Sequence, residues 1–136
     1  FYGWPWSYFG QDVHARVVPQ RPDMVSRAVM PDYALGSPVA PLGLVFADGA
    51  QLGPLFTTGV FIGEHGSWNR RPFSGYKVVF VPFAQGRPSG EPIDVLTGFL
   101  DGDKAMGRPV GVQIAADGAL LVADDVGNVV WRISLK

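Results

Sequence analysis

The residues best suited to chemistry lie in one short segment, Gly63-Glu64-His65-Gly66-Ser67-Trp68-Asn69-Arg70. His65 offers a titratable ring, Asn69 an amide that both donates and accepts hydrogen bonds, and Arg70 a fixed cation. Glycines on either side of the segment permit a tight backbone. Apolar, strand-like runs flank it, so we expect a β-hairpin whose loop carries binding groups.

A second candidate is Arg108, which directly precedes Pro109 at the entrance of another strand-like run. Proline biases the residue before it toward extended backbone, so the Arg108 side chain should be held at the start of that strand. A guanidinium binds carboxylates as a planar fork and lies against planar groups. Arg70 and Arg108 therefore fit a flat, carboxylated ligand, the alternative for Arg108 being a surface arginine in a turn.

Two residues of the central segment leave more than one interpretation open. His65 is either a structural histidine bonded to the backbone or to Glu64, or a residue near a cofactor or substrate. Trp68 either stacks against a sugar or a planar cofactor, or anchors its loop by packing. No catalytic residue is assigned, because no acid–base pair of carboxylates, nucleophilic triad or phosphate-binding glycine loop is evident in the sequence.

Several other polar and aromatic residues are expected to be structural. Asp124 and Asp125 resemble calcium ligands but lack the alternating spacing of a calcium loop, so we interpret them as part of a turn and assign no metal ligand. His14 is expected to be solvent-exposed. Four aromatic residues near it should form a buried cluster that packs the first segment, the alternative being a sugar-binding surface: Trp4, Trp6, Tyr8 and Phe9.

The composition is that of a globular domain. The chain has 136 residues, of which 47% are hydrophobic and 17% charged, enough to bury the core of one ordinary domain. A net charge of −1 gives no electrostatic case for nucleic acid or an anionic membrane surface, and no apolar run is long enough to span a bilayer. The absence of cysteine excludes disulfides and thiolate metal sites. Because the chain starts at Phe1 rather than Met, we expect a piece of a longer protein, the alternative being a processed chain.

The spacing of glycine and proline predicts an all-β protein. The 18 glycines and 12 prolines are scattered between short apolar runs, as in a fold with many turns. Four successive runs, expected to pair as an antiparallel meander, are 42–46, 59–63, 76–83 and 93–100. The segment before them, 1–40, reads as an aromatic, proline-rich leader loop in which Met24 to Met30 alternates weakly enough to suggest a short strand.

An internal repeat follows the meander. The run Pro109-Val110-Gly111-Val112 echoes Pro41-Leu42-Gly43-Leu44, and each copy continues to an Asp-Gly turn. Repeated strand groups of this kind are typical of propeller blades. We therefore expect a partial β-propeller of about two antiparallel, four-stranded blades, with residues 41–100 as one blade and 101–136 as an incomplete last blade. Closure would need the remainder of the propeller or another copy of the chain.

The ordered motifs of the chain resemble the glucose/sorbosone dehydrogenase family, the soluble quinoprotein sugar dehydrogenases, and among them most the L-sorbosone dehydrogenase-type members. The resemblance covers essentially the whole chain. The motifs that carry it are Phe1-Tyr2-Gly3-Trp4-Pro5, Ala40-Pro41-Leu42-Gly43-Leu44, Gly63-Glu64-His65-Gly66-Ser67-Trp68-Asn69-Arg70, Gly75-Tyr76-Lys77-Val78-Val79-Phe80-Val81-Pro82-Phe83, Leu96-Thr97-Gly98-Phe99, Gly107-Arg108-Pro109-Val110-Gly111-Val112 and Val122-Ala123-Asp124-Asp125.

The resemblance implies a six-bladed propeller that binds pyrroloquinoline quinone beside Ca²⁺ and oxidises an aldose or a sugar aldehyde such as sorbosone. It implies quinone contacts at Arg108 and in the region of Asn69 and Arg70, with His65 near the cofactor and Trp68 near the sugar. It further implies an external electron acceptor and a periplasmic or secreted protein. Val110 departs from a second arginine of the better-known glucose dehydrogenases, and Asn69 stands where they have a lysine.

The same resemblance implies that the family's catalytic histidine and calcium loop precede Phe1. On that basis the chain alone is expected to be inactive. The alternative function is a non-catalytic β-propeller binding module, because a fold does not determine an activity.

Overall fold

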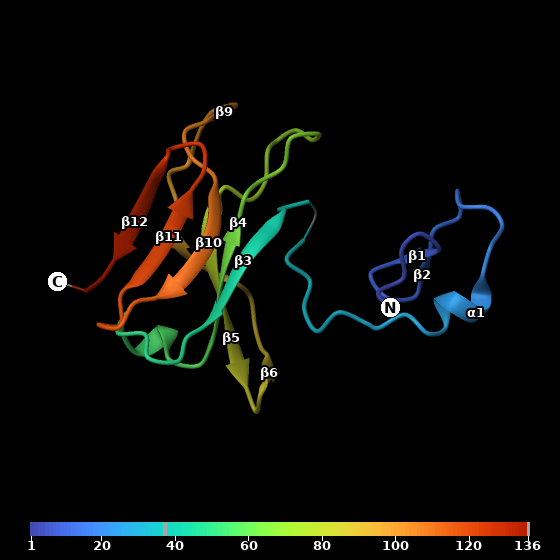
Figure 1. The fold of residues 1–136 in the computed structure, drawn as a ribbon, viewed down its shortest axis with the longest axis horizontal. Helices are drawn as coiled ribbons and strands as arrows, with labels where there is room; N and C mark the ends of the chain where they lie inside the picture. The colour runs from blue at the N-terminus through green and yellow to red at the C-terminus, as the bar shows by residue number, and fades with distance from the viewer. Residues whose placement is uncertain (37, 136) are drawn as a thin grey trace. The chain divides into compact units, whose positions relative to one another are not determined.

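The computed structural model describes residues 1–36 and 38–135, which form two compact units divided between Ala34 and Leu35. Each unit is built around antiparallel strands (Figure 1). Among the described residues the helical elements are α1 (Pro22–Val25) and the 3-10 turn η1 (Pro54–Phe56). The prediction of an all-β protein with antiparallel sheets is therefore confirmed.

The first unit contains a small hairpin and α1. The strands β1 (Ser7–Tyr8) and β2 (Asp12–Val13) pair antiparallel. The short strand expected within 24–30 is wrong, because this stretch contributes to α1 and the turn after it. Pro22 occupies the first turn of the helix, where its fixed φ and missing N–H carry no cost. This proline favours the start of a helix more strongly than the weak alternation favours a strand.

The aromatic residues of the first unit do not form the buried cluster that we expected. Trp4, Tyr8 and Phe9 are each about half exposed or more. His14, in contrast, was expected to be solvent-exposed and is more buried than that. It is only partly exposed, and its ring meets the Trp4 ring edge-on, with centroids 5.5 Å apart.

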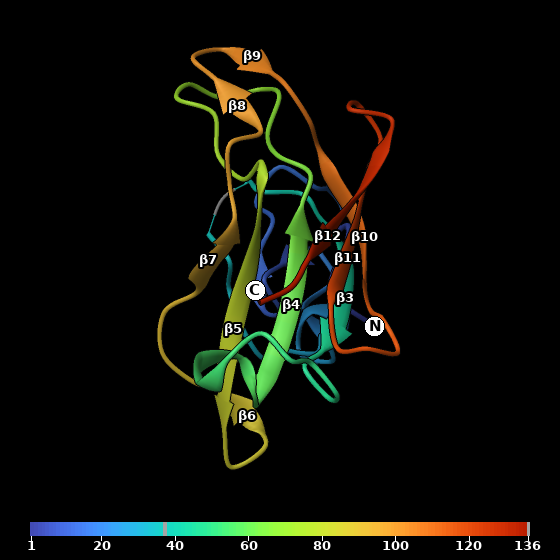
Figure 2. The same ribbon diagram turned by 90° about the vertical axis from the view of Figure 1, so that its left-hand side faces the viewer.

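The second unit carries the predicted meander. The strands β3 (Pro41–Phe46), β4 (Gly59–Glu64), β5 (Lys77–Ala84) and β7 (Ile93–Leu96) lie in that order, all antiparallel (Figure 2). The last strand ends four residues earlier than expected. A short strand β6 (Arg87–Pro88) folds back on the end of β5, and β8 (Leu100–Asp101) pairs with β9 (Lys104–Ala105) in a separate hairpin.

The repeated segment forms a second antiparallel sheet. Its order is β10 (Pro109–Ile114), β11 (Leu120–Asp124) and β12 (Val129–Ile133). The repeat predicts strands in the runs that begin at Pro109, Leu120 and Val129, and the three strands begin at these residues. The two sheets share one hydrophobic core, because alternate residues of β4 and β5 point toward alternate residues of β10 and β11. The core residues are Ala47, Leu52, Phe61, Val78, Phe80, Val112, Leu120 and Val122.

Glycine lets the two sheets approach at one point. A side chain at Gly43 in β3 would collide with the carbonyl oxygen of Val110, and a Cβ at Gly63 in β4 would lie 2.7 Å from the same oxygen. The β10 strand is irregular here, with a register shift between Pro109 and Val112 that presents this carbonyl. Residues with side chains would therefore hold the strands apart.

We expect Gly43→Ala to destabilise the chain by about 1–3 kcal/mol, because the atoms that the new methyl group meets are backbone and cannot rotate away. Gly111→Ala is the matched control. Its Cβ would meet only Ala123 at 4.0 Å, so its free energy of unfolding should change by less than about 0.5 kcal/mol. Urea unfolding of both variants measures this, and equal stabilities would contradict the close approach.

Candidate functional site

The site begins where β4 ends and the loop 65–76 leaves the sheet. The backbone N–H groups of His65 and Gly66 donate to the carbonyls of Ala40 and Val39, at 3.0 and 2.9 Å. The N–H of Ser67 donates to the carbonyl of Ser74 at 2.9 Å. The first residues of this loop are therefore fixed by the segment that enters β3 and by the loop itself.

Arg108 binds the same loop from the second sheet. Its Nη1 donates to the carbonyls of His65 and Gly66, at 3.1 and 3.2 Å, and its Nη2 donates to the Tyr76 hydroxyl at 2.7 Å. Its guanidinium carbon lies 4.6 Å from the centroid of the Tyr76 ring. Arg108 is thus half-buried and held in place, unlike the surface arginine that we considered as the alternative.

His65 lies between a carboxylate and this guanidinium. Its Nε2 is 3.1 and 3.2 Å from the two carboxylate oxygens of Asp125, and its Nδ1 is 3.4 Å from Nη1 of Arg108. Because a guanidinium only donates, Nδ1 must carry the lone pair and Nε2 the hydrogen. Of the structural partners considered for His65, the Glu64 side chain is not the one found, and the ring contacts Asp125.

Asp124 fixes the backbone of Arg108. It is 3% exposed, and it accepts hydrogen bonds from the N–H groups of Arg108 and Gly127, at 2.7 and 2.8 Å, and from Nε1 of Trp131 at 3.1 Å. Burial raises the pKa of this carboxyl, but the hydrogen bonds outweigh that effect and the net pKa is lowered. Asp124 is therefore an ionised anchor for the entrance of β10.

Sequence reasoning treated Asp124 and Asp125 only as turn residues. The turn is present, since residues 125–128 connect β11 to β12. Sequence reasoning missed that Asp124 bonds to the backbone of Arg108 and that Asp125 contacts His65, although the burial of Asp124 could have been inferred. Leu120, Val122 and Asp124 alternate along β11, so the pattern that buries the first two also buries the aspartate.

The remaining candidates lie on the outer part of the loop. Trp68 is 78% exposed, which excludes the packing anchor, and Asn69 and Arg70 are exposed beside it. Arg71 stacks on Phe73, with its guanidinium carbon 3.8 Å from the ring centroid. The structure thus brings His65 and Arg108 into contact and leaves Trp68, Asn69 and Arg70 facing outward.

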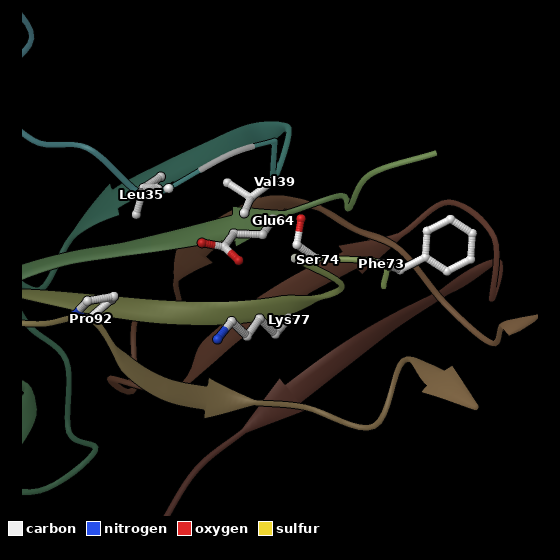
Figure 3. Close-up of a pocket in the computed structure, with 9 residues that line it drawn as sticks. Leu35, Val39, Glu64, Phe73, Ser74, Lys77 and Pro92 are labelled. Atoms are coloured by element: carbon white, nitrogen blue, oxygen red, sulfur yellow. The ribbon is translucent and has the colours of Figure 1, made fainter. Parts of the chain in front are cut away.

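A pocket of about 420 Å³ is lined by Glu64, the last residue of β4, but not by its neighbour His65. Figure 3 shows the Glu64 carboxyl among Ser74, Lys77 and apolar walls that include Val39. Glu64 is 2% exposed, and within the described part of the chain its Oε2 has no hydrogen-bond partner. The ammonium of Lys77 is bound to Asp94 at 2.6 Å.

This burial changes the titration of Glu64. Removal from water raises the pKa of the Glu64 carboxyl to about 7, and this rise is opposed by Lys77 and reinforced by Asp94.

The second property of the site is its capacity to bind a metal ion. Over residues 1–36 and 38–135, no group of three or more histidine, cysteine, aspartate and glutamate side chains is arranged to hold a metal ion.

The chain belongs to the TrAA12-like family, whose pattern matches residues 21–136. An uncharacterized protein of Borreliella burgdorferi is 39% identical over 103 residues, covering 74% of this chain and 27% of that protein. The pyrroloquinoline quinone-dependent pyranose dehydrogenase of Coprinopsis cinerea is 36% identical over 130 residues, covering 79% and 17%. The chain therefore spans well under a third of the length of these relatives.

Solved structures agree with this assignment. The holo form of the pyranose dehydrogenase quinone domain from Coprinopsis cinerea superposes with a TM-score of 0.66 at 30% identity, over 93% of this chain and 34% of that one. A calcium structure of the family AA12 enzyme from Trichoderma reesei gives 0.70 at 20% identity, over 95% and 37%. A glucose dehydrogenase gives 0.69 at 17% identity, over 99% and 35%. The last two share the fold.

We expect the stability of the chain to fall between about pH 4.5 and pH 7 through Glu64. The pKa is raised in the folded state, so the protonated carboxyl contributes its full stability below the ordinary pKa of 4.5, and that contribution is lost as pH rises through about 7. One proton corresponds to at most about 1.4 kcal/mol per pH unit.

Urea unfolding at pH 5, 6, 7 and 8 measures this slope. Glu64→Gln should remove it, because the amide does not ionise. Glu91→Gln, at an exposed position, is the control and should leave the slope unchanged. An identical slope in the Glu64 variant would contradict the assignment.

Proposed function

We propose that the chain forms part of a soluble quinoprotein dehydrogenase, in which Arg108 binds a carboxylate of pyrroloquinoline quinone. The observation that carries the proposal is the fixed guanidinium at the entrance of β10. Membership of the TrAA12-like family and the similarity to a quinone-dependent pyranose dehydrogenase support it. The substrate is an aldose or a sugar aldehyde such as sorbosone.

The donor set of Arg108 fits a carboxylated ligand. A guanidinium has five N–H groups. Its hydrogen bonds within the described residues engage both groups of Nη1 and one group of Nη2. The Nε–H and the second Nη2–H remain, on nitrogens that border the same edge of the guanidinium, and such an edge binds a carboxylate as a fork.

The other candidate residues take roles that follow from their positions. Asn69 and Arg70 are further cofactor contacts on the exposed part of the loop, and Trp68 offers its exposed ring as a stacking surface for the sugar. His65 lies at the edge of the cofactor site, with Nε2 beside the Asp125 carboxylate and Nδ1 facing Nη1 of Arg108 at 3.4 Å. Pyrroloquinoline quinone, when bound, would supply the hydride-accepting chemistry, and the ligands of an accompanying Ca²⁺ would lie mostly outside this chain.

We further propose that the two large sheets are blades of a six-bladed propeller, with residues 1–40 leading into blade 41–100 and the last blade 101–136. The apolar side chains of Leu42, Leu44 and Phe46 support this arrangement, because they are more than half exposed on one face of β3. The remainder of the propeller, or another copy of the chain, would cover them. The partners are a sugar and an electron acceptor.

The location proposed is the periplasm or the outside of the cell. Within the described residues no helix has the length and apolar character needed to cross a membrane. The alternative function is a non-catalytic propeller that binds ligands with the same scaffold. Dye reduction by the complete protein with quinone, Ca²⁺ and aldoses separates the two, since only a dehydrogenase turns over.

Arg108→Ala in the complete protein should weaken quinone binding roughly ten- to a hundredfold, because one charge-assisted contact worth about 1.5–3 kcal/mol is lost. Arg108→Lys should restore only part of the affinity, since it keeps the charge but not the planar fork. Titration of the apoprotein with quinone measures both. Arg132→Ala is the control, an arginine bound to Asp117 on the exposed edge. Equal quinone affinity in all variants would refute the assignment.

Residues 1–136 alone should not oxidise sugars, even with quinone and Ca²⁺. A proton acceptor must face the reacting carbon, and in His65 the Nε2–H faces Asp125 while the Nδ1 lone pair faces the Arg108 guanidinium. The measurement is dye reduction by the purified chain with an aldose series. Turnover above background would show that the base has been misplaced, and its loss in His65→Asn would identify the residue.

A further inference from the structure

Tyr76 is an unusual residue at the start of β5. Its backbone φ is +60°, in the left-handed region that residues with side chains seldom adopt, yet the side chain is only 3% exposed. Such a conformation costs on the order of 1–3 kcal/mol and persists only where the surroundings enforce it. Backbone strain of this kind gathers at functional sites, so the contacts of the ring need an explanation.

Neighbouring residues pack closely against the Tyr76 ring. Gly66 packs against the ring face, and a Cβ at that glycine would overlap the ring atoms. Phe73 covers another side, with ring centroids 5.6 Å apart. Gly75, with a φ of +81°, supplies the turn that brings the backbone into position. Two glycines and one aromatic residue therefore hold a single tyrosine in one orientation.

The hydroxyl of Tyr76 has only one consistent hydrogen-bonding pattern. It lies 2.5 Å from the carbonyl oxygen of Ser67, which can only accept, so the hydroxyl hydrogen is donated there. The same oxygen lies 2.7 Å from Nη2 of Arg108, which can only donate. The phenol oxygen is therefore an acceptor fixed by the main chain, and it occupies one N–H group of Arg108.

We propose that Tyr76 is a positioning residue that sets the orientation of Arg108 for ligand binding. The ring lies against the guanidinium and the hydroxyl holds Nη2, while the loop carbonyls hold Nη1. Rotation about the guanidinium is thereby prevented, and the edge formed by Nε and Nη2 is left for a carboxylate. The inference rests on the proposed function, since it concerns the same ligand.

Removal of the hydroxyl should act on the ligand through Arg108. In Tyr76→Phe the carbonyl of Ser67 loses its donor and Nη2 loses its acceptor, while the shape of the ring is kept. The guanidinium can then turn, and part of the affinity gained from preorganisation is lost. A tyrosine that served the core alone would leave quinone affinity unchanged when its hydroxyl is removed.

The test is a double-mutant cycle in the complete apoprotein, with pyrroloquinoline quinone as the probe. Tyr76→Phe should raise the dissociation constant about tenfold, the loss of one hydrogen bond to a charged group. In the Arg108→Ala background the same substitution should change the dissociation constant less than about twofold. Val79→Ala, within β5 and fully buried, is the control for lost stability and should leave the dissociation constant unchanged.

Each result of the cycle has a distinct meaning. Normal binding by Arg108→Ala overturns the proposed function itself. Weak binding by Arg108→Ala together with normal binding by Tyr76→Phe overturns only the role of Tyr76. Equal weakening by Tyr76→Phe in both backgrounds also overturns it, because the tyrosine would then act independently of the arginine.

A second variant covers the case in which Tyr76→Phe fails to fold. 3,5-Difluorotyrosine at position 76 keeps the ring and the hydroxyl, and at a pH low enough to keep this more acidic phenol protonated its oxygen is a poorer acceptor. Quinone affinity should then fall by less than in Tyr76→Phe and only when Arg108 is present. Unchanged affinity with this variant would overturn the proposal.

Discussion

The hydrogen bonds from Arg108 to the carbonyls of His65 and Gly66 connect the two sheets at the point where their loops meet. Other features of the site depend on this connection. Asp124 fixes the backbone that delivers Arg108, and Tyr76 and the His65–Asp125 pair fix the guanidinium and the ring beside it. The glycine contact with Val110 brings the strands close enough for an arginine side chain to span the gap.

The strands could be predicted because they depend on local patterns. Apolar runs between glycine and proline turns located β3, β4, β5 and the three strands of the repeat within a residue or two. Arg108 at its strand entrance followed from the proline after it. The helix at Pro22 was missed, since a weak alternation was weighed above a helix start signal, and β7 ended four residues before the predicted end.

The polar partners could not be predicted, because they depend on which loops meet in space. The contact of His65 with Asp125 joins residues 60 positions apart, and that of Tyr76 with Arg108 joins residues 32 apart. The sequence offered Glu64, the neighbour of His65, as one possible partner. In the structure the Glu64 carboxyl lies in a separate pocket, and His65 contacts Asp125 instead.

The backbone of His65, Gly66 and Ser67 has a partner for each of its N–H and C=O groups, supplied by the β3 entrance, Ser74, Arg108 and Tyr76. From Trp68 to Arg71 the same loop projects exposed side chains. The loop therefore has a fixed base, residues 65–67, whose backbone is fully hydrogen-bonded, and a tip, residues 68–71, whose side chains are exposed. Sequence change at the tip can diversify what the loop recognises during evolution without disturbing the arginine that the base holds, so related proteins can acquire different ligands on an unchanged scaffold.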